Sequence, residues 1–346
     1  MSPPPTTSIA SGKTTPWLRR AGALFLLLVL LGALGFWLGP RNPMGGSVAT
    51  VRPLPPQDIT ALADWVDASE KAFPDIKPGN AKGIVWASAP GVRTHWSVVY
   101  IHGFSASRME TAPLAETVAA QLGANVFYTR LTGHGRTDGA AMGEASAQDW
   151  MADTLEAVRI GQTLGDKVLL ISCSTGSTLA TWLGTSPDAS RVAAHVFVSP
   201  NFGPKDKRSE LINGPWGQRI ALWVQGPTRS STPESAAEAQ AWTESYPTKA
   251  LFPMMALVKS VRNSDLSRFQ TPVLVLFSEA DQTVDVAQTR SAFTRLGAAH
   301  KSIEPVTYSK AQGQHVLVGA IKDPAAVAPM AQTIVQWVQS LPKELR

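Results

Sequence analysis

The hydrophobic positions of this chain form two different patterns. Near the N-terminus they are continuous, because residues 21–40, AGALFLLLVLLGALGFWLGP, contain no charge. About 20 helical residues that rise about 1.5 Å each span a hydrocarbon layer of ~30 Å. We therefore expect a single membrane-spanning helix at residues 21–40.

From about residue 83 onward, short apolar runs alternate with longer amphipathic stretches. The short runs lack polar alternation, which is typical of strands covered on both faces. Strands that alternate with helices predict an α/β fold, with a mainly parallel sheet and helices on both faces. We expect strands at 83–88, 97–101, 125–128, 168–172, 194–198, 273–277 and 303–307. We expect helices at 109–122, 147–164, 175–183, 284–296 and 324–341.

The alternation stops at residues 201–270, which are rich in Trp, Pro and Ser and show no clear strand pattern. Helical pieces are expected there at 235–244 and 254–261. In open α/β sheets, ligands bind beyond the carboxyl ends of the strands. We therefore predict a mostly helical cap at 201–270, inserted into a core formed by residues 81–200 and 271–346. An inert surface excursion is the alternative.

Basic residues in front of the apolar stretch predict its orientation. Lys13, Arg19 and Arg20 precede it, and such residues are retained on the cytoplasmic side of a membrane. This pattern predicts a cytoplasmic tail at residues 1–20 and a signal anchor. The body of the protein is then expected on the non-cytoplasmic side, in the periplasm or outside the cell.

Secretion after signal cleavage is the alternative to an anchor. Residues 47–49 read Ser-Val-Ala, which has the small-x-small pattern of a cleavage site. The apolar run is longer than that of a signal peptide, however, and Pro40 and Pro43 lie before the site. We favour an uncleaved anchor followed by a linker and lead-in at 41–80, whose prolines at 53–56 form a spacer.

The distribution of charge argues against a nucleic-acid binder, and the content of cysteine and histidine argues against disulfides and zinc sites. Of the net charge of +5, all is accounted for by five basic residues before Asp58, because the other 26 basic residues equal the 26 acidic ones. A nucleic-acid binder would carry its excess on the folded domain. One cysteine, Cys173, allows no internal disulfide. No His or Cys spacing suits zinc, so we expect no metal and no cofactor.

The stretch KVLLISCSTGS places a buried strand directly before small residues. Ser172-Cys173-Ser174-Thr175-Gly176 fits a nucleophile elbow, in which a serine sits on a strained turn between a strand and a helix. Ser172 stands where this pattern usually has glycine. Ser174 is therefore the candidate nucleophile.

A second strand offers the other half of acyl-transfer chemistry. SVVYI ends in His102-Gly103-Phe104, so the backbone N–H of Phe104 lies at a strand end, and the N–H of Thr175 begins the helix after the elbow. Two such donors can stabilise the oxyanion of a tetrahedral intermediate. An ordinary glycine turn is the alternative for the first of them.

A serine nucleophile needs a base and an acid that orients the base. His315, in AQGQHVL, is the one histidine in a loop after the last predicted strand. Glu279, Asp281 and Asp285 follow the preceding strand, and we favour Asp281, because Asp285 falls within the next helix and Glu279 stands at the immediate strand exit. The order Ser174, Asp281, His315 is that of α/β-hydrolases.

From about residue 83 to 340 the chain resembles the α/β-hydrolases that include monoacylglycerol lipases, carboxylesterases and serine aminopeptidases. The motifs YIHGFSAS, LTGHGRTDG, LLISCSTGS, SEADQTVD and QGQHVL stand in that family's order. The resemblance implies Ser174 as nucleophile, Asp281 and His315 as its partners, and Phe104 and Thr175 as oxyanion donors. It implies no metal and no cofactor.

These features predict a serine hydrolase that cleaves carboxylic esters of lipid-like or medium-chain type, such as monoacylglycerols. An aminopeptidase of the proline-iminopeptidase type is the alternative. It would need a carboxylate in the cap to bind the free amino terminus, and Glu234, Glu238 or Glu244 could supply it. A non-catalytic binding protein with this fold is a further alternative. The residues that contact the substrate are not identified, and the candidates are Cys173, Trp216 and Trp223. The sequence indicates no oligomeric state.

Overall fold

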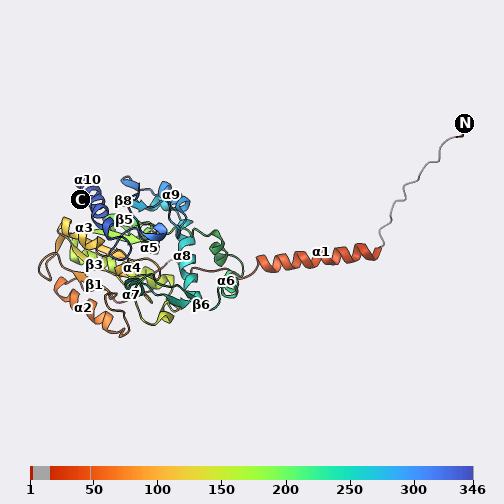
Figure 1. Ribbon diagram of the computed structural model, residues 1–346, viewed down its shortest axis with the longest axis horizontal. Coiled ribbons are helices and arrows are strands. Elements are labelled where there is room, and N and C mark those ends of the chain that lie inside the picture. Colours follow the sequence, from red (N-terminus) through yellow and green to blue (C-terminus); the bar gives the residue numbers. More distant parts are fainter. Residues whose placement is uncertain (3–15, 47, 346) are drawn as a thin grey trace.

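The computed structural model describes residues 1–2, 16–46 and 48–345 (Figure 1). Lys13, used above for the orientation, and Ser47, of the alternative cleavage site, lie outside the described residues. A long helix, α1, projects from a rounded body that contains all the other labelled elements.

The body is built on a sheet of seven strands in the order β1-β3-β2-β4-β5-β8-β9. Strand β1 is antiparallel to β3, and all the other neighbours are parallel. This confirms the expected α/β class with a mainly parallel sheet. The strands are β1 (Gly83–Val85), β2 (Thr94–Ile101), β3 (Asn125–Tyr128), β4 (Gly165–Cys173), β5 (Ala194–Val198), β8 (Val273–Phe277) and β9 (Lys301–Pro305).

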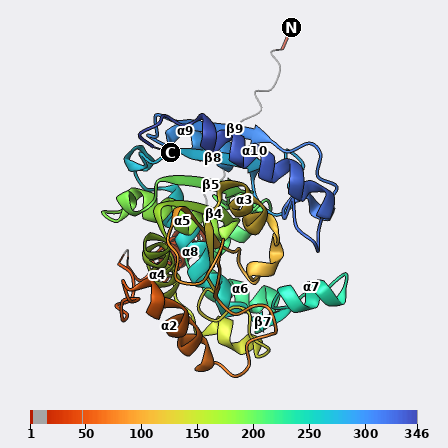
Figure 2. The same ribbon diagram turned by 90° about the vertical axis from the view of Figure 1, so that its left-hand side faces the viewer.

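Helices cover both faces of the sheet, and each face has its own hydrophobic cluster (Figure 2). One cluster joins the sheet to α3 (Leu114–Leu122) and α10 (Val327–Ser340). The other cluster joins it to helices of the opposite face. These are α2 (Ile59–Lys71), α4 (Ala147–Leu164), α5 (Thr175–Thr185), α8 (Leu251–Arg262) and α9 (Val286–Arg295). The central strands are buried on both sides, which explains their continuous apolar runs.

The structure follows the sequence pattern most closely where strands and helices are buried. Strands β3, β5 and β8 and helix α4 have the predicted bounds. The helix expected at 109–122 is divided instead into a short 3-10 turn, Arg108–Glu110, and α3. Pro113 lies directly before α3, and proline has no N–H with which to continue a helix from the preceding turn.

The region between β5 and β8 is mostly helical but contains a small sheet that the sequence pattern did not indicate. Strands β6 (Thr228–Ser230) and β7 (Ser245–Pro247) pair in antiparallel fashion. Three exposed or edge residues are too few to show a period of two. The helices of this region are α6 (Gly217–Gln225), α7 (Ala236–Ala241), α8 and three 3-10 helices (Lys207–Asn213, Thr248–Ala250 and Leu266–Arg268). The bounds 201–270 given to the cap stay a prediction.

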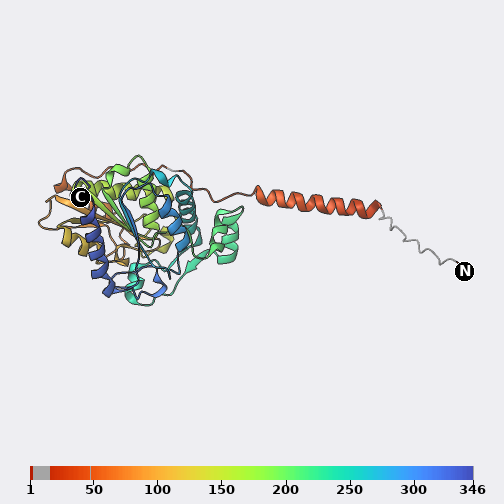
Figure 3. The same cartoon turned by 90° about the horizontal axis from the view of Figure 1, so that it is seen from above.

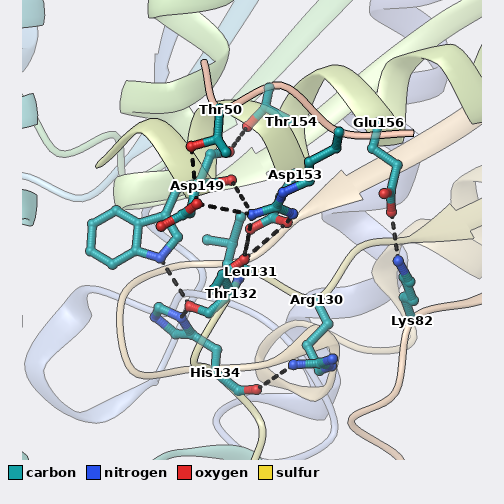
Figure 4. A network of polar contacts seen from close by, with 12 residues as sticks. Thr50, Lys82, Arg130, Leu131, Thr132, His134, Asp149, Asp153, Thr154 and Glu156 are labelled. Carbon is teal, nitrogen blue, oxygen red and sulfur yellow. Dashed lines mark hydrogen bonds and ion pairs between the residues drawn. The ribbon is translucent and has the colours of Figure 1, made fainter. Parts of the chain in front are cut away.

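The segment that precedes the sheet is more structured than a spacer. Helix α2 begins after Asp58, whose side chain accepts a hydrogen bond from Thr60 N–H at 2.9 Å. Upstream, Thr50 N–H donates to the carbonyl oxygen of Gln148 at 3.1 Å, and the Arg52 guanidinium pairs with Asp153. Figure 4 shows Thr50 beside Asp149 and Asp153 on α4. The linker therefore lies against the body, because its polar groups find partners there.

Helix α1 (Pro16–Trp37) has 22 residues, and all of them are exposed. Among the described residues, it is the one helix that is long and apolar enough to cross a membrane. It begins five positions before the expected span and ends three positions before its predicted end, so it includes Arg19 and Arg20. A signal sequence near an N-terminus has the same length and composition.

Candidate active site

Ser174 lies on a tight turn between β4, which ends at Cys173, and α5, which begins at Thr175. Its backbone has φ 51° and ψ −117°, a combination that non-glycine residues rarely adopt and that marks stored strain. A Cβ added to Gly176 would lie 2.8 Å from the carbonyl oxygen of His102. Glycine is therefore required at 176, because α5 passes this close to the end of β2.

The departure at Ser172 is accommodated by hydrogen bonds. Its hydroxyl lies 3.0 Å from the hydroxyl of Ser177, and the Ser177 hydroxyl also donates to the carbonyl oxygen of Ser172 at 3.0 Å. Both side chains are buried. The two hydroxyls satisfy each other where this motif usually has no side chain, so the polar substitution leaves the turn intact.

The structure brings Ser174, His315 and Asp281 into one chain of contacts. His315 Nε2 lies 2.9 Å from Ser174 Oγ, and His315 Nδ1 lies 2.8 Å from Asp281 Oδ2. The three residues follow β4, β8 and β9, which all end at the same edge of the sheet. A proton on Nδ1 that points to Asp281 leaves Nε2 free to accept the proton of the Ser174 hydroxyl.

The other two acidic candidates lie elsewhere. The buried Asp281 accepts backbone hydrogen bonds through Oδ1 from Thr283 N–H at 2.7 Å and Val284 N–H at 2.9 Å. Asp285 instead accepts from Ala287 N–H at 2.9 Å and caps α9. Glu279 pairs with Arg290 on the surface. Only Asp281 is therefore held with a carboxylate oxygen toward the imidazole.

The Phe104 loop lies directly against Ser174. A Cβ added to Gly103 would lie 3.1 Å from Ser174 Cβ, so the backbone of this loop approaches the serine. Leu131 N–H donates to His102 Nε2 at 3.0 Å, which leaves the proton of the ring on Nδ1, 2.9 Å from the Gly103 carbonyl oxygen. Burial, followed by the neighbouring His134, lowers the pKa of His102 to about 3. This neutral histidine holds the loop in place.

The second predicted donor, Thr175 N–H, is the first in helix α5. The first four N–H groups of a helix have no partner within it and carry the positive end of its dipole. The backbone N–H groups of Phe104 and Thr175 remain the predicted donors of an oxyanion hole.

A cavity of about 560 Å³ opens above Ser174 and His315. Its apolar lining is supplied by Phe104, Ile212, Trp242, Tyr246, Leu251, Met254 and Met255. Trp216 and Trp223 do not line it, and Cys173 is fully buried behind the turn. Burial, with the nearby Glu110 adding to it, raises the pKa of the Cys173 thiol well above its usual value. The structure therefore places the three predicted substrate contacts outside this cavity.

Within residues 16–46 and 48–345, no three His, Cys, Asp or Glu side chains are grouped in a way that would hold a metal ion. The charged side chains in the cavity lining are Asp206 and Arg229, and the other polar groups there include Ser105, Asn201, Ser209, Gln225, Gln282 and Thr283.

Comparison with known proteins agrees with this geometry. A family model described as "Serine aminopeptidase, S33" matches residues 93–311, from β2 to the loop that carries His315. The chain belongs to this family. No curated protein sequence is similar enough to give a match.

The fold of this serine aminopeptidase family member is shared with solved lipolytic enzymes. A structure reported for the metagenome-derived lipolytic enzymes LipS and LipT has a TM-score of 0.58 and 21% identity, covering 76% of this chain and 99% of that one. A soluble variant of the Saccharomyces cerevisiae monoglyceride lipase, bound to a substrate analogue, has a TM-score of 0.55 and 14% sequence identity. The match covers 75% of this chain and 91% of that one. The Paleococcus ferrophilus monoacylglycerol lipase has a TM-score of 0.54 and 19% sequence identity, and the match covers 74% of this chain and 96% of that one. These likenesses establish an α/β-hydrolase fold.

Glu110 is a residue of this site that no sequence pattern indicated. Its buried carboxylate accepts hydrogen bonds from Gly103 N–H at 2.6 Å and from the Tyr100 hydroxyl at 2.8 Å. Burial raises the pKa of Glu110 to about 7, although both hydrogen bonds lower it. Glu110 lies just before α3 and therefore looked like an ordinary helix residue in the sequence.

Gln314 is the other unpredicted residue. It has φ 52°, and its side-chain amide donates to the carbonyl oxygens of Ser309 at 3.0 Å and Ala311 at 2.9 Å. Its side-chain oxygen accepts from the Ser278 hydroxyl at 2.8 Å. These contacts tie the loop that carries His315 to the end of β8. A glutamine beside the histidine was the only signal, and it has no distinctive pattern.

Proposed function

We propose that this protein is a serine hydrolase that cleaves carboxylic esters, with Ser174 as the nucleophile, His315 as the base and Asp281 as the orienting acid. The observation that carries the proposal is the position of His315, whose two ring nitrogens lie 2.9 Å from Ser174 Oγ and 2.8 Å from Asp281 Oδ2. Both distances are within hydrogen-bond range for a nucleophile and its base.

The proposed reaction has two acyl transfers. His315 Nε2 accepts the proton of Ser174 while Oγ attacks the ester carbonyl, and the backbone N–H groups of Phe104 and Thr175 stabilise the oxyanion. His315 then gives the proton to the departing alkoxide, which leaves as an alcohol. Water attacks the acyl-enzyme, His315 takes one of its protons, and collapse releases the carboxylic acid and returns that proton to Ser174.

The cavity lining favours a lipid-like or medium-chain acyl group. Trp242, Tyr246, Leu251 and two methionines provide an apolar wall next to Ser174. A volume of about 560 Å³ lies within the range of small-molecule sites. Arg229 lies in the same lining and would meet the polar part of such an ester.

The aminopeptidase alternative has less support from the cap. Glu234 and Glu238 pair with Lys322, and neither these two residues nor Glu244 lines the cavity. Asp206 does line it, but its carboxylate is engaged by the Arg208 guanidinium at 2.8 Å. A free amino terminus would therefore meet no unpaired cap carboxylate of the predicted set. The binding-protein alternative does not account for a base held 2.9 Å from Ser174 Oγ.

We also propose that α1 is a retained membrane anchor with the body on the non-cytoplasmic side. The residues just after α1 are part of the fold, because Asn42 donates to Asn213 at 3.0 Å and Gln148 donates to the Met44 carbonyl oxygen at 2.8 Å. Cleavage at the Ser-Val-Ala site would remove both contacts. This observation favours the anchor over secretion after cleavage.

The test uses the full-length protein in nanodiscs with p-nitrophenyl esters of increasing acyl length. Ser174→Ala is expected to lower turnover by about 10⁴-fold or more while the melting temperature stays unchanged. Ser209→Ala, which also lines the cavity, is the matched control and should keep its activity. Turnover by Ser174→Ala within about tenfold of the unsubstituted protein would refute the assignment. Hydrolysis of aminoacyl amides in preference to esters would favour the peptidase.

A further inference from the structure

The residues that directly follow α1 form hydrogen bonds with the cap. Helix α1 ends at Trp37, and the carbonyl oxygen of Pro40 already accepts a hydrogen bond from Trp216 N–H at 2.7 Å. Asn42 donates to the carbonyl oxygen of Phe252 on α8 at 2.8 Å. Two residues between Trp37 and Pro40 span at most about 10 Å. If α1 lies in a bilayer, the surface around Trp216 is therefore held close to that bilayer.

The surface beside these hydrogen bonds exposes large apolar side chains. Leu222, Trp223 and Val224 of α6 have exposed fractions of 40%, 86% and 63%, and Leu211 of the preceding 3-10 helix has 60%. Figures 1 and 3 both show α6 on the side of the body from which α1 departs. Soluble surfaces rarely gather large apolar residues in this way. We call these four residues the α6 face.

Exposed basic residues lie in the same stretch of the cap as the α6 face and directly after α1. They are Arg41, Lys205, Lys207, Arg208, Arg219 and Arg229. Asp206 and Glu210 are the acidic residues of the same stretch, so the basic residues outnumber the acidic ones and the net charge is positive. Exposed apolar residues that include tryptophan, together with nearby basic residues, are typical of surfaces that bind the interfacial layer of a membrane with anionic lipids.

We propose that the α6 face docks on the bilayer that holds α1, with Trp223 at the level of the lipid headgroups, and that ester substrates pass from this bilayer to Ser174. The inference rests on the proposed ester hydrolysis and on α1 as a retained anchor. It adds the surface through which a membrane-borne substrate reaches the site.

Two adjoining cavities lie between the α6 face and Ser174. A second cavity of about 320 Å³ lies between the 3-10 helix Lys207–Asn213 and α6, with Leu211, Ile220 and Val224 in its wall. It shares Ile212, Leu251 and four polar residues with the cavity above Ser174. An acyl chain that leaves the bilayer at the α6 face would therefore meet apolar walls along its way to the serine.

The first arm of the test measures depth in the membrane. Cys173 is fully buried, so a new surface cysteine can be labelled selectively with an environment-sensitive nitrobenzoxadiazole dye. Full-length Trp223→Cys, Leu30→Cys and Val92→Cys variants are placed in nanodiscs of phosphatidylethanolamine and phosphatidylglycerol that contain doxyl lipids. Leu30 lies in the middle of α1, and Val92 is an exposed residue before β2, at the opposite edge of the sheet from Ser174.

Dye at position 223 should be quenched about threefold more than dye at position 92. Equal quenching at positions 223 and 92, with position 30 strongly quenched, would overturn the docking. A lack of quenching at position 30 would remove the anchor and the inference with it.

The second arm measures delivery of the substrate. Trp223→Glu should lower the hydrolysis of a long-chain monoacylglycerol in the nanodisc by about tenfold, because a carboxylate is disfavoured at the interface. Hydrolysis of soluble p-nitrophenyl butyrate should stay the same, since Trp223 lines neither cavity. Val92→Glu is the matched control. Equal rates of Trp223→Glu and Val92→Glu on the monoacylglycerol would overturn the inference. Hydrolysis of neither ester by the unsubstituted protein would instead refute the proposed function.

Discussion

The turn at Ser174 and helix α6 stand near the same edge of the sheet, but different interactions determine their structures. Ser174 is fixed by the sheet itself, because its N–H donates to the carbonyl oxygen of Val198 at 3.0 Å. Of the nine residues of α6, only Gly217 and Ala221 are buried. The turn is therefore set by buried strands, whereas α6 is placed by the chain that leaves α1 and by its neighbours in the cap. Chemistry is expected to depend on the first region and substrate delivery on the second.

The largest effect is expected in the core, at Asp281, the proposed acid that orients the base. Asp281→Asn should lower turnover by about 10⁴-fold, because an amide does not stabilise the imidazolium or hold the required tautomer of His315. Asp285→Asn is the matched change a few residues away, and its side chain can still accept from Ala287 N–H to cap α9. Steady-state rates with a p-nitrophenyl ester compare the two variants. A larger loss in Asp285→Asn would reassign the acid.

An intermediate effect is expected where the lead-in contacts the core. Arg52 pairs with the buried Asp153, whereas Arg208 pairs with Asp206 on the exposed surface of the cap. Arg52→Ala leaves a buried carboxylate without its cation, at a cost of about 2 kcal/mol. Arg208→Ala should leave stability almost unchanged, because both members of this pair are exposed to solvent.

Thermal unfolding in the same nanodiscs measures this difference between the two arginines. Equal melting temperatures would show that the lead-in contributes nothing to the stability of the core. That result would also favour the prediction that the prolines at 53–56 form a spacer.

The smallest effect concerns pH and the buried Glu110. Burial raises the pKa of Glu110 from 4.5 to about 7. Between pH 4.5 and 7, Glu110 is therefore protonated in the folded protein and ionised in the unfolded chain. Stability from this residue is therefore present at low pH and falls as pH rises toward 7. Glu110→Gln should abolish this fall. The melting temperature of the variant, relative to the unsubstituted protein, should rise by a few degrees between pH 5 and 8.

The buried histidines give the opposite trend, since burial lowers the pKa of His134 to about 4. Their contribution is lost as pH falls below the usual histidine value, and it is the same in both proteins. The difference between Glu110→Gln and the unsubstituted protein thus isolates Glu110. A constant difference across the pH range would mean that Glu110 has an ordinary pKa in the folded state.

The sequence was most informative where local rules and the sheet act together. Ser174 follows a buried strand, and Gly176 is required by the close approach of α5 to β2, so both left a motif. Asp281 and His315 could be found because parallel strands end at one edge of the sheet. Glu110 and Gln314 left no motif, because their partners come from loops that meet only in the folded structure.

The cap shows the limit of prediction from aromatic residues. Trp216 and Trp223 were the tryptophans predicted as candidate contacts of a substrate, and Trp242 was not among the candidates. In the structure Trp242 lines the cavity, Trp216 packs against the lead-in at Gly39, and Trp223 is exposed. The contacts of Trp216 with Gly39 and Pro40 join residues that lie far apart in the sequence, and no periodic pattern records such contacts.

The central claim is that Ser174 is the residue that becomes acylated. The most direct measurement is to react the full-length protein with a fluorophosphonate, digest it, and locate the adduct by mass spectrometry. We expect a single modified peptide with the phosphonyl group on Ser174, and no adduct in Ser174→Ala. An adduct on a different serine, or continued ester turnover without any adduct, would contradict it.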